Sequence, residues 1–166
     1  RNMYELGALL IVTAIERGIL KEEEWEFYGV GLGTAQLELT KGNFLQQLPR
    51  MNLKEYIESI SGYDIGITLM ASPHPSLLPF DLAGSGCVVV TNNCYNKSQK
   101  YFDTISENII SKEPDLEDLI EGIKIAVKRV ASLEDRYTAA ENMKFPRTWD
   151  ETWTENHRIW IKKVLG

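Results

Sequence analysis

Two apolar runs lie near the middle of the chain, and each has the composition of a strand that is buried on both faces. The first spans Asp64–Met70 and the second spans Cys87–Thr91. A turn rich in Pro and Ser and a short helical segment, Leu77–Gly84, separate them. Strand, loop, helix and strand within about thirty residues predict a right-handed βαβ unit whose two strands are parallel.

The rest of the chain alternates between helical and extended patterns. Apolar residues at helical spacing predict helices over Asn2–Arg17, Leu53–Ser61, Asp115–Leu133, Glu134–Met143 and Asp150–Leu165. Extended patterns predict strands over Trp25–Gly31, Leu37–Leu39 and Phe44–Leu48, and an edge strand over Ser106–Ile110. Asn2 stands three residues before Glu5, the spacing of a capping box, so we expect Asn2 to cap the first helix. The alternation predicts an α/β fold, a Rossmann-like open parallel sheet with helices on both faces, in one domain over residues 1–166.

The composition of the chain argues against several classes of function. The net charge is -6 and no stripe of Lys or Arg stands out, which argues against a nucleic-acid partner. No apolar run approaches the roughly 20 residues that span a bilayer, and no signal-peptide pattern is present. Cys87 and Cys94 have no metal or redox spacing, so we expect reduced thiols in a cytoplasmic protein.

Ligands of parallel α/β sheets bind at the carboxyl ends of the strands, which directs attention to the loop after the first run and to the end of the second. The candidate ligand-binding residues there are Ser72, His74, Pro75, Ser76, Thr91 and Asn92. Ser76 precedes a helix N-terminus, where its hydroxyl and free N–H groups can hold a phosphate. His74 lies between two prolines, and its alternative role is to shape the turn.

Asp81 lies about one turn into the helix that follows this loop. A carboxylate at that position can accept two hydrogen bonds from the vicinal hydroxyls of a ribose. Its neighbours in the helix are apolar almost all round, so we expect Asp81 to be partly enclosed and to need partners. The alternative is an ordinary solvated helix acid.

Several familiar catalytic systems are absent from the sequence. There is no P-loop motif, and the glycines at 29–33 are not followed by a convincing helix, so a dinucleotide fingerprint is not supported. His74 and His157 are far apart and the cysteines lack a CxxC spacing. We therefore expect neither a metal nor a cofactor.

Two motifs carry a resemblance to a known family. The central one combines SPHPS at Ser72–Ser76, the acid Asp81, Ser85-Gly86 and VVVTN at Val88–Asn92, and the second is the opening RNMYELG at residues 1–7. Together they resemble the nucleotide-sugar-binding C-terminal domain of GT-B glycosyltransferases, and are most similar to retaining rhamnosyltransferases of S-layer and O-antigen glycan assembly. In that family the Arg of the opening motif faces the donor diphosphate. The resemblance therefore implies a catalytic role for Arg1, which on the residues alone is more simply a solvated terminal side chain.

The resemblance also has departures. Retaining enzymes of this kind have two glutamates eight positions apart, and here Pro73 stands at the first position and Asp81 at the second. The resemblance implies transfer of a sugar, with rhamnose as the candidate, from a dTDP- or UDP-linked donor to a glycan acceptor with retention and without a metal. Arg1 and Asp81 would be its catalytic residues, and Arg1 would stabilise the leaving diphosphate electrostatically.

The resemblance further implies that the chain is a fragment without its N-terminal acceptor domain, and that alone it binds the donor without transferring the sugar. The last helix, Asp150–Leu165, would return to that missing domain, which leaves Trp149, Trp153 and Trp160 partly exposed here. Expected partners are a nucleotide-sugar donor and a glycan acceptor. Peripheral association with the inner face of the membrane is open to the full-length protein.

Two other functions stay open at this stage. A non-catalytic nucleotide-sugar-binding domain is favoured by Asp81 and Pro73 standing where the pattern has glutamates. One half of a sugar-nucleotide epimerase is the other alternative, because such epimerases share the fold and carry further catalytic groups in the half that is absent here.

Overall fold

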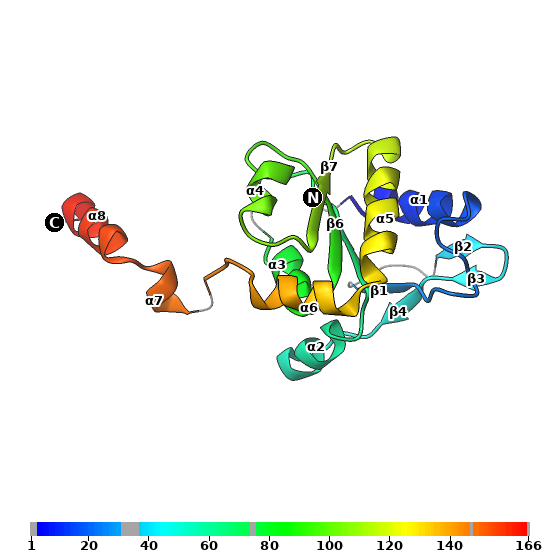
Figure 1. Cartoon of the computed structure of the whole chain (residues 1–166), viewed down its shortest axis with the longest axis horizontal. Helices are drawn as coiled ribbons and strands as arrows, with labels where there is room; N and C mark the ends of the chain where they lie inside the picture. The colour runs from blue at the N-terminus through cyan, green and yellow to red at the C-terminus, as the bar shows by residue number, and fades with distance from the viewer. Residues whose placement is uncertain (1–2, 31–36, 74–75, 147, 166) are drawn as a thin grey trace.

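A computed structural model describes residues 3–30, 37–73, 76–146 and 148–165 of the chain (Figure 1). Its central sheet has three parallel strands in the order β5 (Ile65–Thr68), β6 (Val88–Asn92) and β7 (Ile109–Lys112). Helices α3 (Leu78–Gly84) and α4 (Gln99–Asp103) make the crossovers between them. The predicted βαβ unit is therefore confirmed, and β7 is an edge strand of this sheet as expected.

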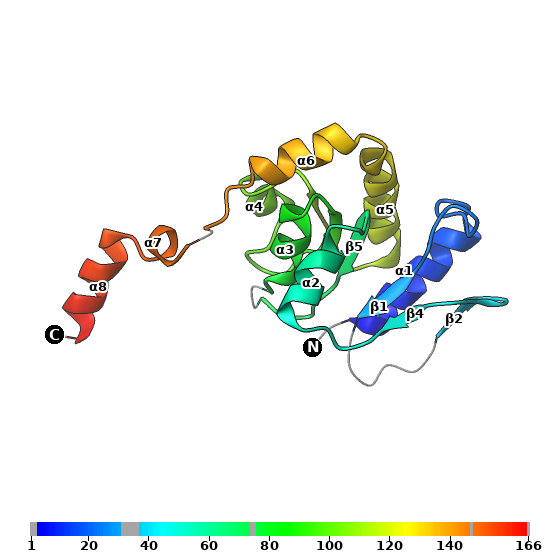
Figure 2. The ribbon, with the colours of Figure 1, turned by 90° about the horizontal axis from the view of Figure 1, so that it is seen from below.

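Helices cover both faces of the central sheet, as Figure 2 shows from below. Helices α1 (Tyr4–Glu16) and α5 (Leu116–Val130) pack on one face, and α3 and α4 pack on the other. Every residue of β6 is buried. Val88 and Val90 belong to the core under α1 and α5, whereas Val89 belongs to the core under α3 and α4. The Rossmann-like α/β prediction is confirmed.

Two smaller strand pairs lie in the N-terminal part of the chain. β1 (Tyr28–Val30) and β4 (Gln46–Leu48) pair in parallel, and β2 (Glu38–Thr40) and β3 (Asn43–Phe44) form an antiparallel hairpin. Gly42 has a φ of 83° in the hairpin turn, a conformation that glycine adopts readily. The strand predicted over Phe44–Leu48 is divided between β3 and β4. Of the strand predicted over Trp25–Gly31, the structure describes only β1 as a strand.

The start of the first helix differs from the prediction. The N-cap of α1 is Met3, which makes no side-chain capping hydrogen bond, so the capping box predicted with Asn2 as N-cap is wrong. The Met3 backbone N–H instead donates to the carbonyl oxygen of Leu69 at 3.1 Å. A tertiary hydrogen bond to the end of β5 therefore sets where this helix begins.

Four further helices are described in the chain. These are α2 (Leu53–Ile60), α6 (Leu133–Glu141) and a C-terminal arm made of α7 (Trp149–Thr152) and α8 (Glu155–Leu165). The predicted single helix over residues 150–165 is wrong, because the backbone of Trp153 leaves the helical region and ends α7. Figure 1 shows the arm extending away from the body of the domain. Trp149, Trp153 and Trp160 are all exposed, as expected.

No helix in the described ranges is both long enough and apolar enough to cross a bilayer. Both cysteines are free, as predicted, and Cys87 is fully buried under α3 and α4. Burial raises the pKa of the Cys87 thiol from its ordinary value of 9.0 to about 12.

We predict that this buried thiol makes the domain less stable in alkali. Above pH 9 the thiol ionises in the unfolded chain but stays protonated in the folded domain. The contribution of this thiol to the free energy of unfolding is therefore fully present below pH 9 and is lost as the pH rises toward 12. The free energy of unfolding should fall by at most about 1.4 kcal/mol per pH unit from this group. Urea unfolding near pH 8 and near pH 10.5 measures the loss.

Cys87→Ala should lower the free energy of unfolding at both pH values. Between the two pH values, the free energy of unfolding of this variant should fall less than that of the wild type. The matched control is Val89→Ala, which removes apolar volume from the same core and leaves the thiol in place. Equal pH dependence in Cys87→Ala and Val89→Ala would contradict the prediction.

Candidate functional site

The candidate site lies at the carboxyl edge of the central sheet, where two polar residues end β6. Thr91 is 3% exposed and its hydroxyl donates to the carbonyl oxygen of Thr68 at 2.7 Å. Asn92 is 2% exposed; its Oδ1 accepts the N–H of Met70 at 2.7 Å and its Nδ2 donates to the Met70 carbonyl at 3.0 Å. Both side chains therefore attach β5 to β6 just before the loop that follows β5. Their predicted contact with a ligand stays a prediction.

The loop after β5 is described in part. His74 and Pro75 lie outside the described residues, as does Arg1, so their predicted roles stay predictions. Ser72 is half-buried. The hydroxyl of Ser76 accepts the backbone N–H of Leu78 at 3.3 Å, at the first residue of α3. Ser76 therefore satisfies one of the free amide groups that the sequence assigned to a phosphate, and its role in phosphate binding also stays a prediction.

Asp81 is exposed, which corrects the expectation that it would be partly enclosed. Phe80, Leu82 and Ala83 are the residues of α3 that face the core, and this leaves Asp81 on the outer side of the helix. The carboxylate is still held, because its Oδ2 accepts a hydrogen bond from the Tyr56 hydroxyl at 3.2 Å. The site therefore joins α3 to α2, two helices that the sequence could not place side by side.

Tyr56 is the residue that the sequence-based prediction of the site did not include. It has the spacing of a core residue of α2, and its ring does pack against the core that contains Phe80 and Val89. Its hydroxyl nevertheless reaches Asp81. Burial raises the pKa of Tyr56 to about 12, and the negative charge of Asp81 and the hydrogen bond to it act in the same direction. Tyr56 is thus a neutral hydrogen-bond donor throughout the physiological range.

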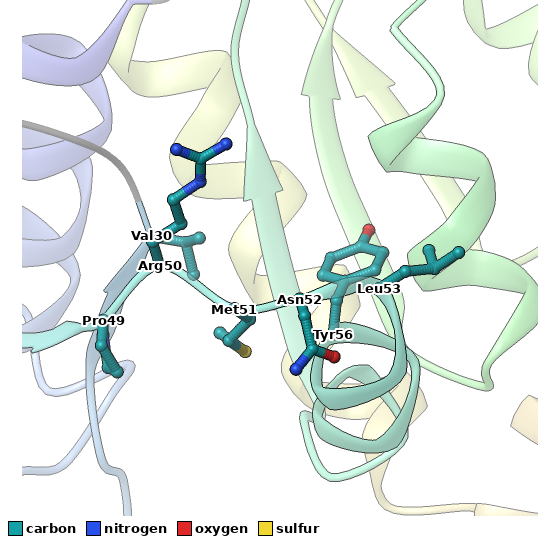
Figure 3. Close-up of a pocket in the computed structure, with 7 residues that line it drawn as sticks. All are labelled: Val30, Pro49, Arg50, Met51, Asn52, Leu53 and Tyr56. Atoms are coloured by element: carbon teal, nitrogen blue, oxygen red, sulfur yellow. The ribbon is translucent and has the colours of Figure 1, made fainter.

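A pocket of about 350 Å³ opens beside this pair, at the carboxyl ends of β1 and β4 (Figure 3). Its lining residues are Val30, Pro49, Arg50, Met51, Asn52, Leu53 and Tyr56. Most of this lining is apolar, and Tyr56 is shared between the pocket and the contact with Asp81. Arg50 makes no hydrogen bond or ion pair with any described residue.

The position of α2 beside the pocket follows from its first turn. Asn52 caps the helix by accepting the N–H of Glu55 at 3.0 Å, and the Glu55 carboxylate accepts the N–H of Asn52 at 2.9 Å. This reciprocal capping box satisfies two backbone donors at the helix start. It therefore fixes where α2 begins at the pocket wall, one turn before Tyr56.

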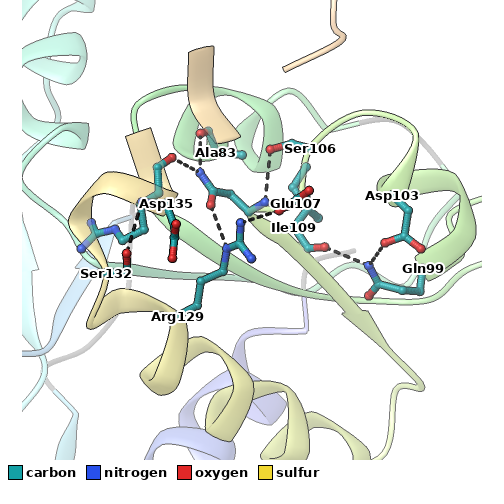
Figure 4. Close-up of polar contacts among 11 residues, drawn as sticks. Ala83, Gln99, Asp103, Ser106, Glu107, Ile109, Arg129, Ser132 and Asp135 are labelled. Atoms are coloured by element: carbon teal, nitrogen blue, oxygen red, sulfur yellow. Dashed lines mark hydrogen bonds and ion pairs between the residues drawn. The ribbon is translucent and has the colours of Figure 1, made fainter. Parts of the chain in front are cut away.

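The opposite, amino edge of the sheet is closed by buried polar contacts. Arg136 of α6 donates to the Gly86 carbonyl at 2.8 Å and pairs with Asp64 at 2.7 Å. Asn108 is fully buried; its Nδ2 donates to the Arg136 carbonyl at 2.8 Å and its Oδ1 accepts from Arg129 at 3.2 Å (Figure 4). Asn108 also explains why the predicted strand over residues 106–110 is wrong at its start, since these contacts hold its side chain in the turn before β7.

Among the described residues, no group of three His, Cys, Asp or Glu side chains is arranged to hold a metal ion. The described part of the carboxyl edge offers the Asp81 carboxylate bonded to Tyr56 and the Glu113 carboxylate bonded to Asn93. The apolar pocket lies beside Tyr56, and Arg50 in its lining has no partner among the described residues. Independence from metal ions stays a prediction.

The three-stranded parallel sheet with helices on both faces defines a Rossmann-like α/β domain. The Tyr56–Asp81 contact and the adjoining pocket form its candidate site. The family model described as "WsaF, C-terminal domain" matches residues 1–124. The chain therefore belongs to the WsaF C-terminal domain family, which is a glycosyltransferase-associated family. The matched region contains all the candidate site residues. No curated protein matches the chain.

We predict that Asn92→Ala destabilises the domain by about 2–3 kcal/mol, because it removes both hydrogen bonds to Met70 and leaves backbone groups without partners. Thr91→Val should cost less, about 1 kcal/mol, since it removes a single hydrogen bond and keeps the side-chain volume. Urea unfolding of the two variants tests this order. Unchanged stability in Asn92→Ala would contradict the role of Asn92 in attaching β5 to β6.

Proposed function

We propose that this chain is the donor-binding domain of a retaining glycosyltransferase, and that a nucleoside diphosphate sugar binds at the carboxyl edge of its sheet. The observation that carries the proposal is the Tyr56–Asp81 contact beside an apolar pocket, at the edge where parallel α/β sheets bind ligands. Membership of a glycosyltransferase-associated family supports the same class of ligand.

The base, the ribose and the diphosphate of such a donor each have a proposed counterpart in this site. The apolar lining of the pocket suits the flat ring of a base, and about 350 Å³ lies within the range of small-molecule sites. Asp81 is exposed beside the pocket and suits a ribose hydroxyl, because an ionised carboxylate accepts hydrogen bonds only. The diphosphate would then extend toward the loop at residues 72–76, with Arg1 as its cationic partner by resemblance.

The proposed reaction breaks the bond between the sugar carbon and the diphosphate oxygen and forms a bond from that carbon to the oxygen of an acceptor hydroxyl. The proton of that hydroxyl passes to the departing diphosphate. The leaving diphosphate gains negative charge in this step. A guanidinium and backbone N–H groups placed at that charge stabilise the transition state more than the ground state. Rhamnose as the sugar, retention of configuration and a glycan acceptor come to the proposal from the resemblance alone.

Two observations favour the second candidate, a domain that binds a nucleotide sugar without taking part in catalysis. Pro73 stands where the retaining pattern has a glutamate, and Asp81 is exposed and hydrogen-bonded to one described residue, Tyr56. Both candidates require donor binding by this chain, and only the first requires turnover when an acceptor domain is present.

We predict that UDP, dTDP or GDP stabilises the chain in a thermal-shift panel, and that Asp81→Asn weakens binding of the best of them by about 1–2 kcal/mol, since it removes the charged acceptor of a hydrogen bond. Isothermal titration gives the dissociation constants. The matched control is Asp150→Asn, the same chemical change at an exposed acid on α7, whose ion pair with Arg158 is on the surface. Absence of stabilisation by all three nucleotides would overturn the proposal.

We also predict that Arg1→Ala weakens binding of the nucleoside diphosphate by about 1.5–3 kcal/mol, the range for a hydrogen bond to a charged group. Binding of the corresponding nucleoside should be unchanged, because it has no phosphate for the guanidinium to contact. Arg158→Ala, at an exposed arginine of α8, serves as the control. Equal weakening for nucleotide and nucleoside would contradict a diphosphate contact by Arg1.

A further inference from the structure

We infer that Tyr56 is a positioning residue for donor recognition: its hydroxyl orients the Asp81 carboxylate toward a ribose hydroxyl. This inference rests on the proposed function, since it concerns the same site. It adds a residue that neither the sequence motifs nor the family description assigns.

The first step is the geometry of the pair. Tyr56 is on α2 and Asp81 is on α3, so the 3.2 Å hydrogen bond between them connects the pocket wall to the helix that carries the acid. The bond engages Oδ2 of the carboxylate. Oδ1 accepts no hydrogen bond from a described residue, and the side chain is exposed, so this oxygen is accessible to a ligand.

The second step is that the Tyr56 ring has a fixed place. The ring packs against the core that contains Phe80 and lines the pocket on its other side. The capping box of Asn52 and Glu55 sets the start of α2 one turn earlier. The hydroxyl is therefore presented to Asp81 by a half-buried ring that packs against the core.

The third step is what Asp81 would do without this hydrogen bond. An exposed aspartate samples several rotamers, and a ligand that binds it must then restrict that freedom at an entropic cost. A hydrogen bond present before the ligand arrives holds one carboxylate orientation in advance. A tyrosine hydroxyl that stays protonated far above neutral pH donates this bond at every physiological pH.

Loss of the Tyr56 hydroxyl should affect only the recognition of ribose hydroxyls. A merely structural contact between α2 and α3 would not give this selectivity. Loss of the Tyr56 hydroxyl should weaken only ligands that use Asp81. A ligand that lacks the ribose hydroxyls should bind the variant and the wild type equally, because the ring that forms the pocket wall is unchanged in Tyr56→Phe.

The test measures dissociation constants of the full chain for two ligand pairs, UDP with 2′,3′-dideoxy-UDP and dTDP with its 3′-deoxy analogue. For whichever nucleotide binds, the wild type should have a dissociation constant about tenfold lower for the nucleotide than for its deoxy analogue. Tyr56→Phe should reduce that preference about three- to fivefold and leave the affinity for the deoxy member unchanged. Tyr137→Phe, at a tyrosine of α6 that packs against Gly86 at the amino edge, is the matched control and should keep the wild-type preference.

A double-mutant cycle completes the experiment. Asp81→Asn should abolish most of the preference, and adding Tyr56→Phe to it should have no further effect, since Tyr56 acts through Asp81. A preference that is unchanged in Tyr56→Phe, or an equal loss for both members of a pair, overturns the inference and leaves the donor site in place. Failure of the folded wild type to bind any of the four ligands, together with no stabilisation by GDP, overturns the proposed function itself.

Discussion

The complete burial of β6 is the constraint on which the rest of the domain depends. All of its residues, Val88–Asn92, are buried, and none is more than 3% exposed. A parallel strand buried in this way needs a neighbouring strand on each side and a layer of helices on each face. The chain meets this requirement with β5 and β7 beside β6, with α1 and α5 on one face, and with α3 and α4 on the other.

The two ends of this buried sheet have different roles. At the amino edge, Arg136 and Asn108 satisfy buried polar groups, and such contacts stabilise the fold because an unpaired buried polar group is costly. At the carboxyl edge, Thr91 and Asn92 attach β5 to β6. Asn93 is hydrogen-bonded to Ser111 and Glu113, whereas Asp81 is exposed. Asp81 and Arg50 keep polar atoms without partners in the described part of the chain, which is a condition for binding a ligand.

The family match and the structure divide the chain at different points. The match ends at residue 124, within α5, yet Arg136 of α6 completes the amino edge of the sheet. Residues beyond the matched region are therefore part of the folded body. The C-terminal arm of α7 and α8 differs from α6, because its tryptophans are exposed in the described structure and none of its residues is buried.

Local sequence patterns predicted the βαβ unit, the order of the main elements and the sheet edge of the candidate site. They could do so because apolar runs and helical periodicity are local patterns that burial on both faces imposes on the chain. They did not predict that Asp81 is exposed, that Met3 is the N-cap of α1, or that Tyr56 reaches Asp81. Those features depend on contacts between segments far apart in the chain, such as α2 with α3 and α1 with the end of β5. The orientation of a side chain at such a contact is decided by tertiary packing, and no local pattern records it.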